Sequence, residues 1–93
     1  MKKVLVQFSL PGVTTKQYDQ TWETLRKTGQ AEPKGLIHHT GCQTGNTIMV
    51  CDVWESEEAY KKFGDTLTPI MTKLGITNTT PTIIPVHYDY CNN

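Results

Sequence analysis

The sequence lacks features that are typical of nucleic-acid-binding, membrane and secreted proteins. Arg26 is its only arginine, and nine basic residues balance nine acidic ones. Nucleic-acid-binding domains usually carry a basic stripe, so we expect no nucleic-acid partner. No apolar run approaches the roughly 20 residues that cross a bilayer, and the start "MKKVLVQFSLPG" is too short and interrupted for a signal peptide. We therefore expect a cytoplasmic protein with no membrane partner.

Cysteine and serine are also sparse. The three cysteines, Cys42, Cys51 and Cys91, are an odd number without metal-ligand spacing. Cys42 and Cys51 fall on neighbouring predicted strands about 13 Å apart at ~3.3 Å per residue, too far for a disulfide. Ser9 and Ser56 are the only serines, and Ser56 suits a helix cap. No glycine-rich phosphate loop is present, so neither serine-hydrolase nor phosphate chemistry is expected.

What the sequence does contain is a regular hydrophobic pattern. It predicts strands over 2–10, 34–42, 47–54 and 81–90, and helices over 15–28 and 57–74. Thr14 and Gln17 form a capping box for the first helix, and Ser56 caps the second. The order β-α-β-β-α-β is the ferredoxin-like α+β unit, in which two helices cover one face of a four-stranded antiparallel sheet. We expect one such domain over residues 1–93.

The pair His38-His39 lies in a predicted strand, where successive side chains point to opposite faces, so the two rings cannot form one site. The turn through Gly45 allows two registers, which pair His39 with either Val50 or Asp52. In both registers His39 and Asp52 share a face and lie within reach of each other. A carboxylate near an imidazole fixes its tautomer, so we expect His39 to be a general base oriented by Asp52.

A structural role for His39 is the alternative, because a histidine on a sheet is more often a hydrogen-bonded packing group than a catalyst. We interpret His38, on the opposite face, as structural. Its expected neighbours on that face are Leu36, Thr40, Met49, Cys51 and Val53.

The face of His87 depends on the register of the last predicted strand. If His87 joined His39 and Asp52, the three would resemble a two-histidine, one-carboxylate metal site. The usual close spacing is absent, so we expect no metal.

The uncovered face of the predicted sheet includes Met49 and Val53, which are costly to leave in water. A chain of this size buries only roughly 60–65 % of its unfolded surface, and association is a common remedy. A standard interface buries ~800 Å² per partner. We expect a homodimer in which the open sheet faces of two copies meet.

The run 33–74 and the last strand resemble a group within the dimeric α/β-barrel superfamily, which contains the antibiotic-biosynthesis-monooxygenase-like proteins. The shared pattern is a glycine, a histidine four residues later, "DVWES", an "F…L.P" helix and a final "P.H". Its positions here are Gly35, His39, 52–56, Phe63, Leu67, Pro69, Pro85 and His87. The resemblance implies a dimeric ferredoxin-like fold and favours His39 and Trp54 as cavity residues.

Members of this superfamily include cofactor-free monooxygenases, haem-degrading enzymes, isomerases and lactone-forming proteins. The resemblance implies an oxidoreductase without cofactor, in which His39 removes a proton from a hydroxyaromatic or quinol. The residues expected to bind this substrate are Trp54, Phe63, Trp22, Tyr18 and His87. Two alternatives are a non-catalytic binder of a small hydrophobic molecule (quinone, flavin or haem) and a structural or stress-related dimer.

Overall fold

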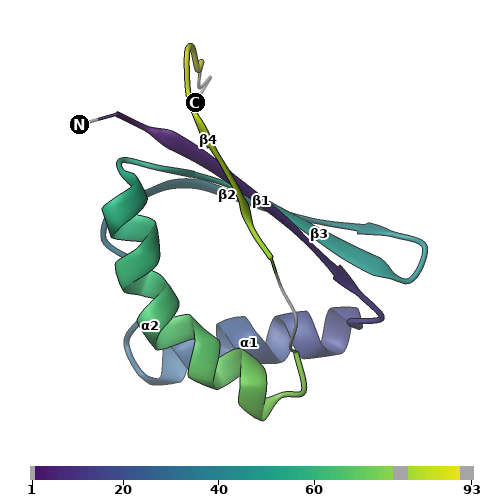
Figure 1. The fold of residues 1–93 in the computed structure, drawn as a ribbon. Coiled ribbons are helices and arrows are strands. Elements are labelled where there is room, and N and C mark those ends of the chain that lie inside the picture. The colour runs from purple at the N-terminus through teal and green to yellow at the C-terminus, as the bar shows by residue number, and fades with distance from the viewer. Residues whose placement is uncertain (1, 77–79, 91–93) are drawn as a thin grey trace.

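The computed structural model describes residues 2–76 and 80–90. Its elements are β1 (Val4–Pro11), α1 (Thr15–Lys27), β2 (Leu36–Thr44), β3 (Thr47–Trp54), α2 (Glu57–Lys73) and β4 (Thr82–Pro85). The strands form one antiparallel sheet in the order β2-β3-β1-β4. Both helices lie on the same side of this sheet (Figure 1). The predicted ferredoxin-like fold is confirmed.

The two helices begin where the capping residues predict. The backbone N–H of Thr14 donates to Gln17 Oε1 over 2.9 Å, and the Gln17 N–H donates to Thr14 Oγ1 over 3.1 Å. Ser56 Oγ accepts from the Ala59 N–H over 3.1 Å. Each bond satisfies an amide that the helix itself leaves free. The Gln17 side chain also donates to the Leu74 carbonyl over 3.1 Å, which joins the start of α1 to the end of α2.

The β2–β3 hairpin has one of the two registers that the sequence allowed. Thr44 pairs with Thr47, so Gly45 and Asn46 form the turn. Gly45 has a φ of 60°, a left-handed conformation that glycine adopts without steric cost. This register places His39 directly opposite Asp52.

The predicted position of Leu36 is wrong. Leu36 pairs with Trp54, whereas His38 pairs with Val53, so the register shifts at Ile37. An extra residue in a strand reverses the alternation of side chains on its two sides. Leu36 therefore packs against the Trp54 cluster on the helix side of the sheet, and Ile37 is 47% exposed.

The last strand is shorter than predicted, since β4 ends at Pro85. Val4 is the residue of β1 that pairs with Pro85, and the Val86 N–H donates to the Lys3 carbonyl over 2.9 Å. His87 follows this bond and lies exposed in a bend. β4 is an edge strand, because it pairs with β1 alone, and an edge position tolerates a residue without a backbone N–H such as Pro85.

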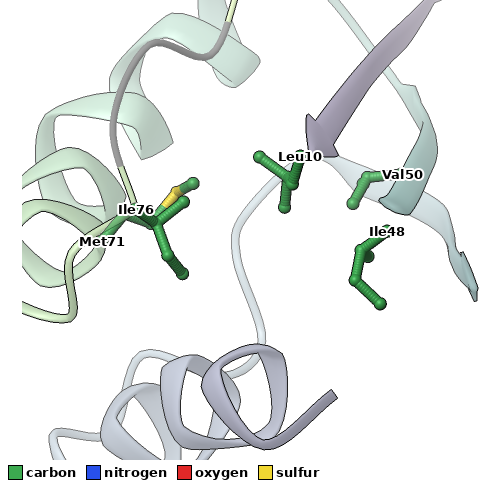
Figure 2. Close-up of a cluster of buried hydrophobic side chains, with 5 residues drawn as sticks. All are labelled: Leu10, Ile48, Val50, Met71 and Ile76. Atoms are coloured by element: carbon green, nitrogen blue, oxygen red, sulfur yellow. The ribbon is translucent and has the colours of Figure 1, made fainter. Parts of the chain in front are cut away.

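The core has two buried clusters between the sheet and the helices. One contains Val4, Val6 and Trp54. The other contains Leu10, Ile48, Val50, Met71 and Ile76. In Figure 2, Leu10 and Val50 extend from β1 and β3 toward the side where Met71 and Ile76 lie. The candidate site lies where the two clusters meet.

Candidate functional site

A cavity of about 40 Å³ opens between the helix side of the sheet and the two helices. Its walls are mostly apolar and draw on both core clusters, including Leu10, Val50 and Trp54. A space of this size holds a few water molecules. Any aromatic ligand therefore requires the partly exposed side chains at its mouth to move aside. The predicted site residues that line it are Tyr18, Trp22, His39, Asp52, Trp54 and Phe63.

Asp52 and His39 form a hydrogen-bonded pair in the wall of this cavity. His39 Nδ1 lies 2.5 Å from Asp52 Oδ1, as expected for residues directly opposite each other on paired strands. The Asp52 side chain is 9% exposed and that of His39 is 21% exposed. The predicted proximity of these two residues is therefore observed.

A second donor satisfies the other oxygen of the Asp52 carboxylate. Trp54, two residues along β3 on the same face, donates its indole N–H to Asp52 Oδ2 over 3.4 Å. Burying a carboxylate is costly unless its oxygens are hydrogen-bonded. His39 and Trp54 supply one bond to each oxygen, which makes a nearly buried carboxylate tolerable at this point of the core.

The other ring nitrogen of His39 is also engaged. The Tyr18 hydroxyl, from the first turn of α1, lies 2.5 Å from His39 Nε2. Trp22, one helical turn later, meets the imidazole edge to face, with ring centres 4.9 Å apart. The ring is therefore held by hydrogen bonds at both nitrogens and by an aromatic contact.

Burial raises the pKa of the Tyr18 hydroxyl above its usual value; a hydrogen bond with the Trp22 side chain opposes this shift in the pKa, and the negative charge of Asp52 adds to it. At neutral pH the hydroxyl therefore keeps its proton. The three side chains form a continuous chain of hydrogen bonds, Tyr18–His39–Asp52, that begins at the cavity and ends at the buried carboxylate.

Gly41 leaves room for this arrangement. A Cβ atom at Gly41 would lie 2.5 Å from the Tyr18 hydroxyl oxygen and 2.7 Å from its ring. Any larger residue there must displace the tyrosine. Sequence reasoning missed Gly41, although a glycine inside a strand, two residues from a candidate base, is itself a sign of close approach by another group.

The remaining histidines lie elsewhere. His38 is exposed on the opposite face of the sheet, where its Nε2 lies 2.8 Å from Thr40 Oγ1. His87 is exposed beyond β4 and is not part of the cavity wall, so the fold of the single chain does not bring it to His39 and Asp52. Within residues 2–76 and 80–90, no three histidine, cysteine, aspartate or glutamate side chains are grouped to hold a metal ion.

Cys42 and Cys51 are both free thiols. They lie on the open face of the sheet, where Cys42 pairs with Met49 and Cys51 pairs with Thr40. The two cysteines are therefore two positions apart along the paired strands, and the larger separation predicted from the sequence is wrong, because the turn lies one residue later than that prediction assumed. Cys91 lies outside the described residues. No helix in the described part of the chain is long and apolar enough to cross a membrane.

No protein-family model matches this sequence, and no curated protein does. Solved structures do share its fold. SnoaB, a cofactor-independent oxygenase from Streptomyces nogalater solved in a mutant form, has a TM-score of 0.70 at 13% identity, over 96% of this chain and 97% of that one. ActVA-Orf6, a monooxygenase from Streptomyces coelicolor in complex with nanaomycin D, has a TM-score of 0.67 at 15% identity, over 99% and 94%.

A third structure, a dimeric ferredoxin-like protein from an uncultured marine organism, has a TM-score of 0.66 at 13% identity and covers 100% of this chain and 95% of its own. At identities this low, structural similarity establishes the fold and not the activity. The chain has the ferredoxin-like fold of the antibiotic-biosynthesis monooxygenase-like proteins. The ferredoxin-like fold of the chain, predicted from the sequence resemblance, is therefore confirmed.

Proposed function

We propose that this protein is a small oxidoreductase that oxidises a hydroxyaromatic or quinol substrate with molecular oxygen in the cavity described above. The observation that carries the proposal is the hydrogen-bonded chain Tyr18–His39–Asp52 on the wall of an apolar cavity. Structural likeness to a cofactor-independent oxygenase supports the same class of reaction. The aromatic walls suit a planar substrate, with Trp22, Trp54 and Phe63 as the expected contacts.

The chemistry requires a base and a dry site. Removing the hydroxyl proton of the substrate leaves a phenolate, which gives up an electron to oxygen more readily than the neutral phenol does. The proton moves to His39, and the Asp52 carboxylate stabilises the resulting imidazolium. A phenol with a free para position and one O₂ give a para-quinone and one water. This reaction balances without a further reductant, so the proposal needs no cofactor.

We also infer that the working form is a homodimer joined through the open sheet face. Paired positions on that face form a row across all four strands: His38, Val53, Leu5 and Ile84. Val53 and Leu5 are half-buried in the single chain, and Ile84 is 46% exposed. Burying this row against a second copy removes apolar surface from water. Light scattering at micromolar concentration tests the dimer, and a monomer there contradicts it.

Oxygen uptake by purified, metal-stripped protein tests the activity. The substrates are anthrones, naphthols and quinols, with the autoxidation of free substrate subtracted. A general base contributes roughly 10²–10⁴-fold to a rate, so His39→Ala is expected to lower the protein-dependent uptake by about that factor. Tyr60→Phe is the control, because Tyr60 is partly buried near the cavity but does not line it, and this variant is expected to keep wild-type uptake.

Uptake that is unchanged in His39→Ala places the base elsewhere. No uptake with any substrate contradicts the oxygenase and favours the alternative of a non-catalytic binder for a small hydrophobic molecule. Such a binder keeps the apolar cavity but needs no base, so His39→Ala then leaves ligand affinity nearly unchanged. A cavity that takes up no ligand favours a structural dimer.

A further inference from the structure

His39 has no nitrogen left for a ligand. Its Nδ1 lies 2.5 Å from Asp52 Oδ1 and its Nε2 lies 2.5 Å from the Tyr18 hydroxyl oxygen. A neutral imidazole has only these two positions for a hydrogen bond. A ligand in the cavity therefore meets the imidazole through its carbon edge, or it meets Tyr18.

We assign the direction of each hydrogen bond for an ionised Asp52 and a neutral His39. An ionised carboxylate only accepts, so Nδ1 of His39 carries the proton that Asp52 Oδ1 receives. In the neutral ring Nε2 then carries no proton and accepts one from the Tyr18 hydroxyl. The Tyr18 proton is thereby committed to His39. The Trp22 side chain lies near enough to donate one hydrogen bond to the Tyr18 oxygen, so what this oxygen still offers to the cavity is its remaining lone pair, an acceptor.

We propose that the Tyr18 oxygen is the ligand-contacting end of this chain and that it accepts a hydrogen bond, so the cavity prefers a hydroxyl-bearing aromatic ligand over the corresponding ether or ketone. His39 and Asp52 are then positioning residues that act through Tyr18. This inference rests on the proposed function, because it assumes that the cavity is the ligand site, and it specifies which form of ligand the site selects.

The same arrangement gives the proposed reaction its proton path. The substrate hydroxyl gives its proton to the Tyr18 oxygen while the Tyr18 proton passes to His39 Nε2. One O–H bond breaks and one forms at Tyr18, one N–H bond forms at His39, and the substrate becomes a phenolate. Tyr18 ends unchanged, and the positive charge on His39 lies beside Asp52. Burial keeps the Tyr18 hydroxyl protonated between turnovers, because it raises the pKa of that group.

Equilibrium dialysis under nitrogen tests the preference without any oxidation. Three probes of nearly equal size are compared: 1-naphthol, which donates a hydrogen bond; 1-methoxynaphthalene, its methyl ether, which does not; and 1-tetralone, which presents a carbonyl. A net hydrogen bond corresponds to a factor of about 2–10 in affinity. Wild type is expected to bind 1-naphthol tighter than either other probe by about this factor.

Tyr18→Phe is expected to abolish the preference and to leave the affinity for 1-methoxynaphthalene nearly unchanged. The matched control is Tyr60→Phe, which removes a hydroxyl from another partly buried tyrosine. Tyr60 meets Trp54 edge to face at 5.8 Å but does not line the cavity. It is expected to keep the wild-type preference.

Asp52→Asn gives a readout that a merely structural role would not produce. The Trp54 indole N–H needs an acceptor, so the amide oxygen of the new side chain turns to it and the NH₂ group faces His39 Nδ1. Nδ1 then accepts, Nε2 carries the proton and donates to the Tyr18 oxygen, and the Tyr18 hydroxyl becomes free to donate. The preference is expected to reverse, with 1-tetralone bound tighter than 1-naphthol.

Gly41→Ala tests the position of Tyr18 by a separate route. The new Cβ would lie 2.5 Å from the tyrosine oxygen, so the ring must move and the preference for 1-naphthol is expected to be lost. Gly64→Ala in α2 is the control, because a Cβ there meets nothing within 4 Å.

Equal binding of the three probes by wild type, or an unchanged preference in Tyr18→Phe, overturns the inference. Binding of none of the probes overturns it together with the ligand site. The preference for 1-naphthol, lost in Tyr18→Phe, supports it even where oxygen uptake is absent, so the failure of the oxygenase and the failure of the inference are separate results.

Discussion

The two faces of the sheet differ in burial: one packs against the helices, and the described residues leave the other uncovered. Strand β3 contributes residues to both faces. Its residues alternate between buried and half-buried from Thr47 to Trp54. The buried set includes Trp54, which has no exposed surface, and Asp52, which is 6% exposed when its backbone is counted with its side chain. The other set, including Met49 and Val53, lies on the face that no helix of the described residues covers. A period of two thus gives one strand two functions.

The comparison shows on which face a polar side chain needs hydrogen-bond partners within the protein. On the helix side, Asp52 is tolerated because His39 and Trp54 bond its two oxygens, and among the described residues no buried side-chain nitrogen or oxygen lacks a partner. On the open side, polar residues such as Gln7 and Thr40 are exposed to water and need no such arrangement. Chemistry is therefore expected on the first face and association on the second.

The largest loss of stability is expected from a substitution on the face of the sheet that packs against the helices. Trp54→Ala removes a fully buried side chain and one hydrogen bond to Asp52, which should lower the free energy of unfolding by about 3–5 kcal/mol. Urea unfolding in dilute protein measures this loss. Met49→Ala, on the same strand but the open face, is the control and should cost clearly less. Equal losses from the two variants would contradict the distinction between the faces.

An intermediate effect is expected from a charge on the open side. Val53→Asp places a carboxylate in the centre of the inferred interface, where it would face apolar groups and its own copy. Light scattering should show a monomer at concentrations where wild type is dimeric, while circular dichroism keeps the wild-type signal. Val53→Thr, which keeps the branched shape, is the control. A dimer that persists in Val53→Asp would show that association uses another surface.

The smallest effect concerns the tyrosines packed near the helix side at alkaline pH. Burial raises the pKa of Tyr18 and of Tyr60, and Asp52 adds to both shifts. The unfolded chain loses these protons at about pH 10, whereas the folded chain still holds them. The resulting stability is complete below that pH and is lost as the pH rises toward the folded values. The urea midpoint should therefore fall less between pH 8 and 10.5 in the double variant Tyr18→Phe, Tyr60→Phe than in wild type. An equal fall would show that other groups control the alkaline limit.

Much of the fold followed from local rules. The capping residues Thr14 and Ser56 predicted where both helices begin, because a side-chain oxygen must satisfy the free amides of the first turn. The site followed from alternation: His39 and Asp52 share a face in either hairpin register, and so their contact could be expected before the register was known. Leu36 and His87 could not be placed in this way. A shift in the register at Ile37 places Leu36 on the opposite face of the sheet from the one predicted. His87 lies beyond Pro85, where the pairing of β4 with β1 ends.

The sequence by itself determined the order of the elements, the face on which each strand residue lies outside the bulge, and the proximity of His39 to Asp52. These features depend on the period of the hydrophobic pattern and on neighbours within a hairpin, and both can be identified from residues close together in the sequence. Only the tertiary structure decided that Tyr18 occupies the second nitrogen of His39 and that Gly41 leaves room for it. That contact joins α1 to β2, and its geometry depends on how the helix packs against the sheet, which no local pattern specifies.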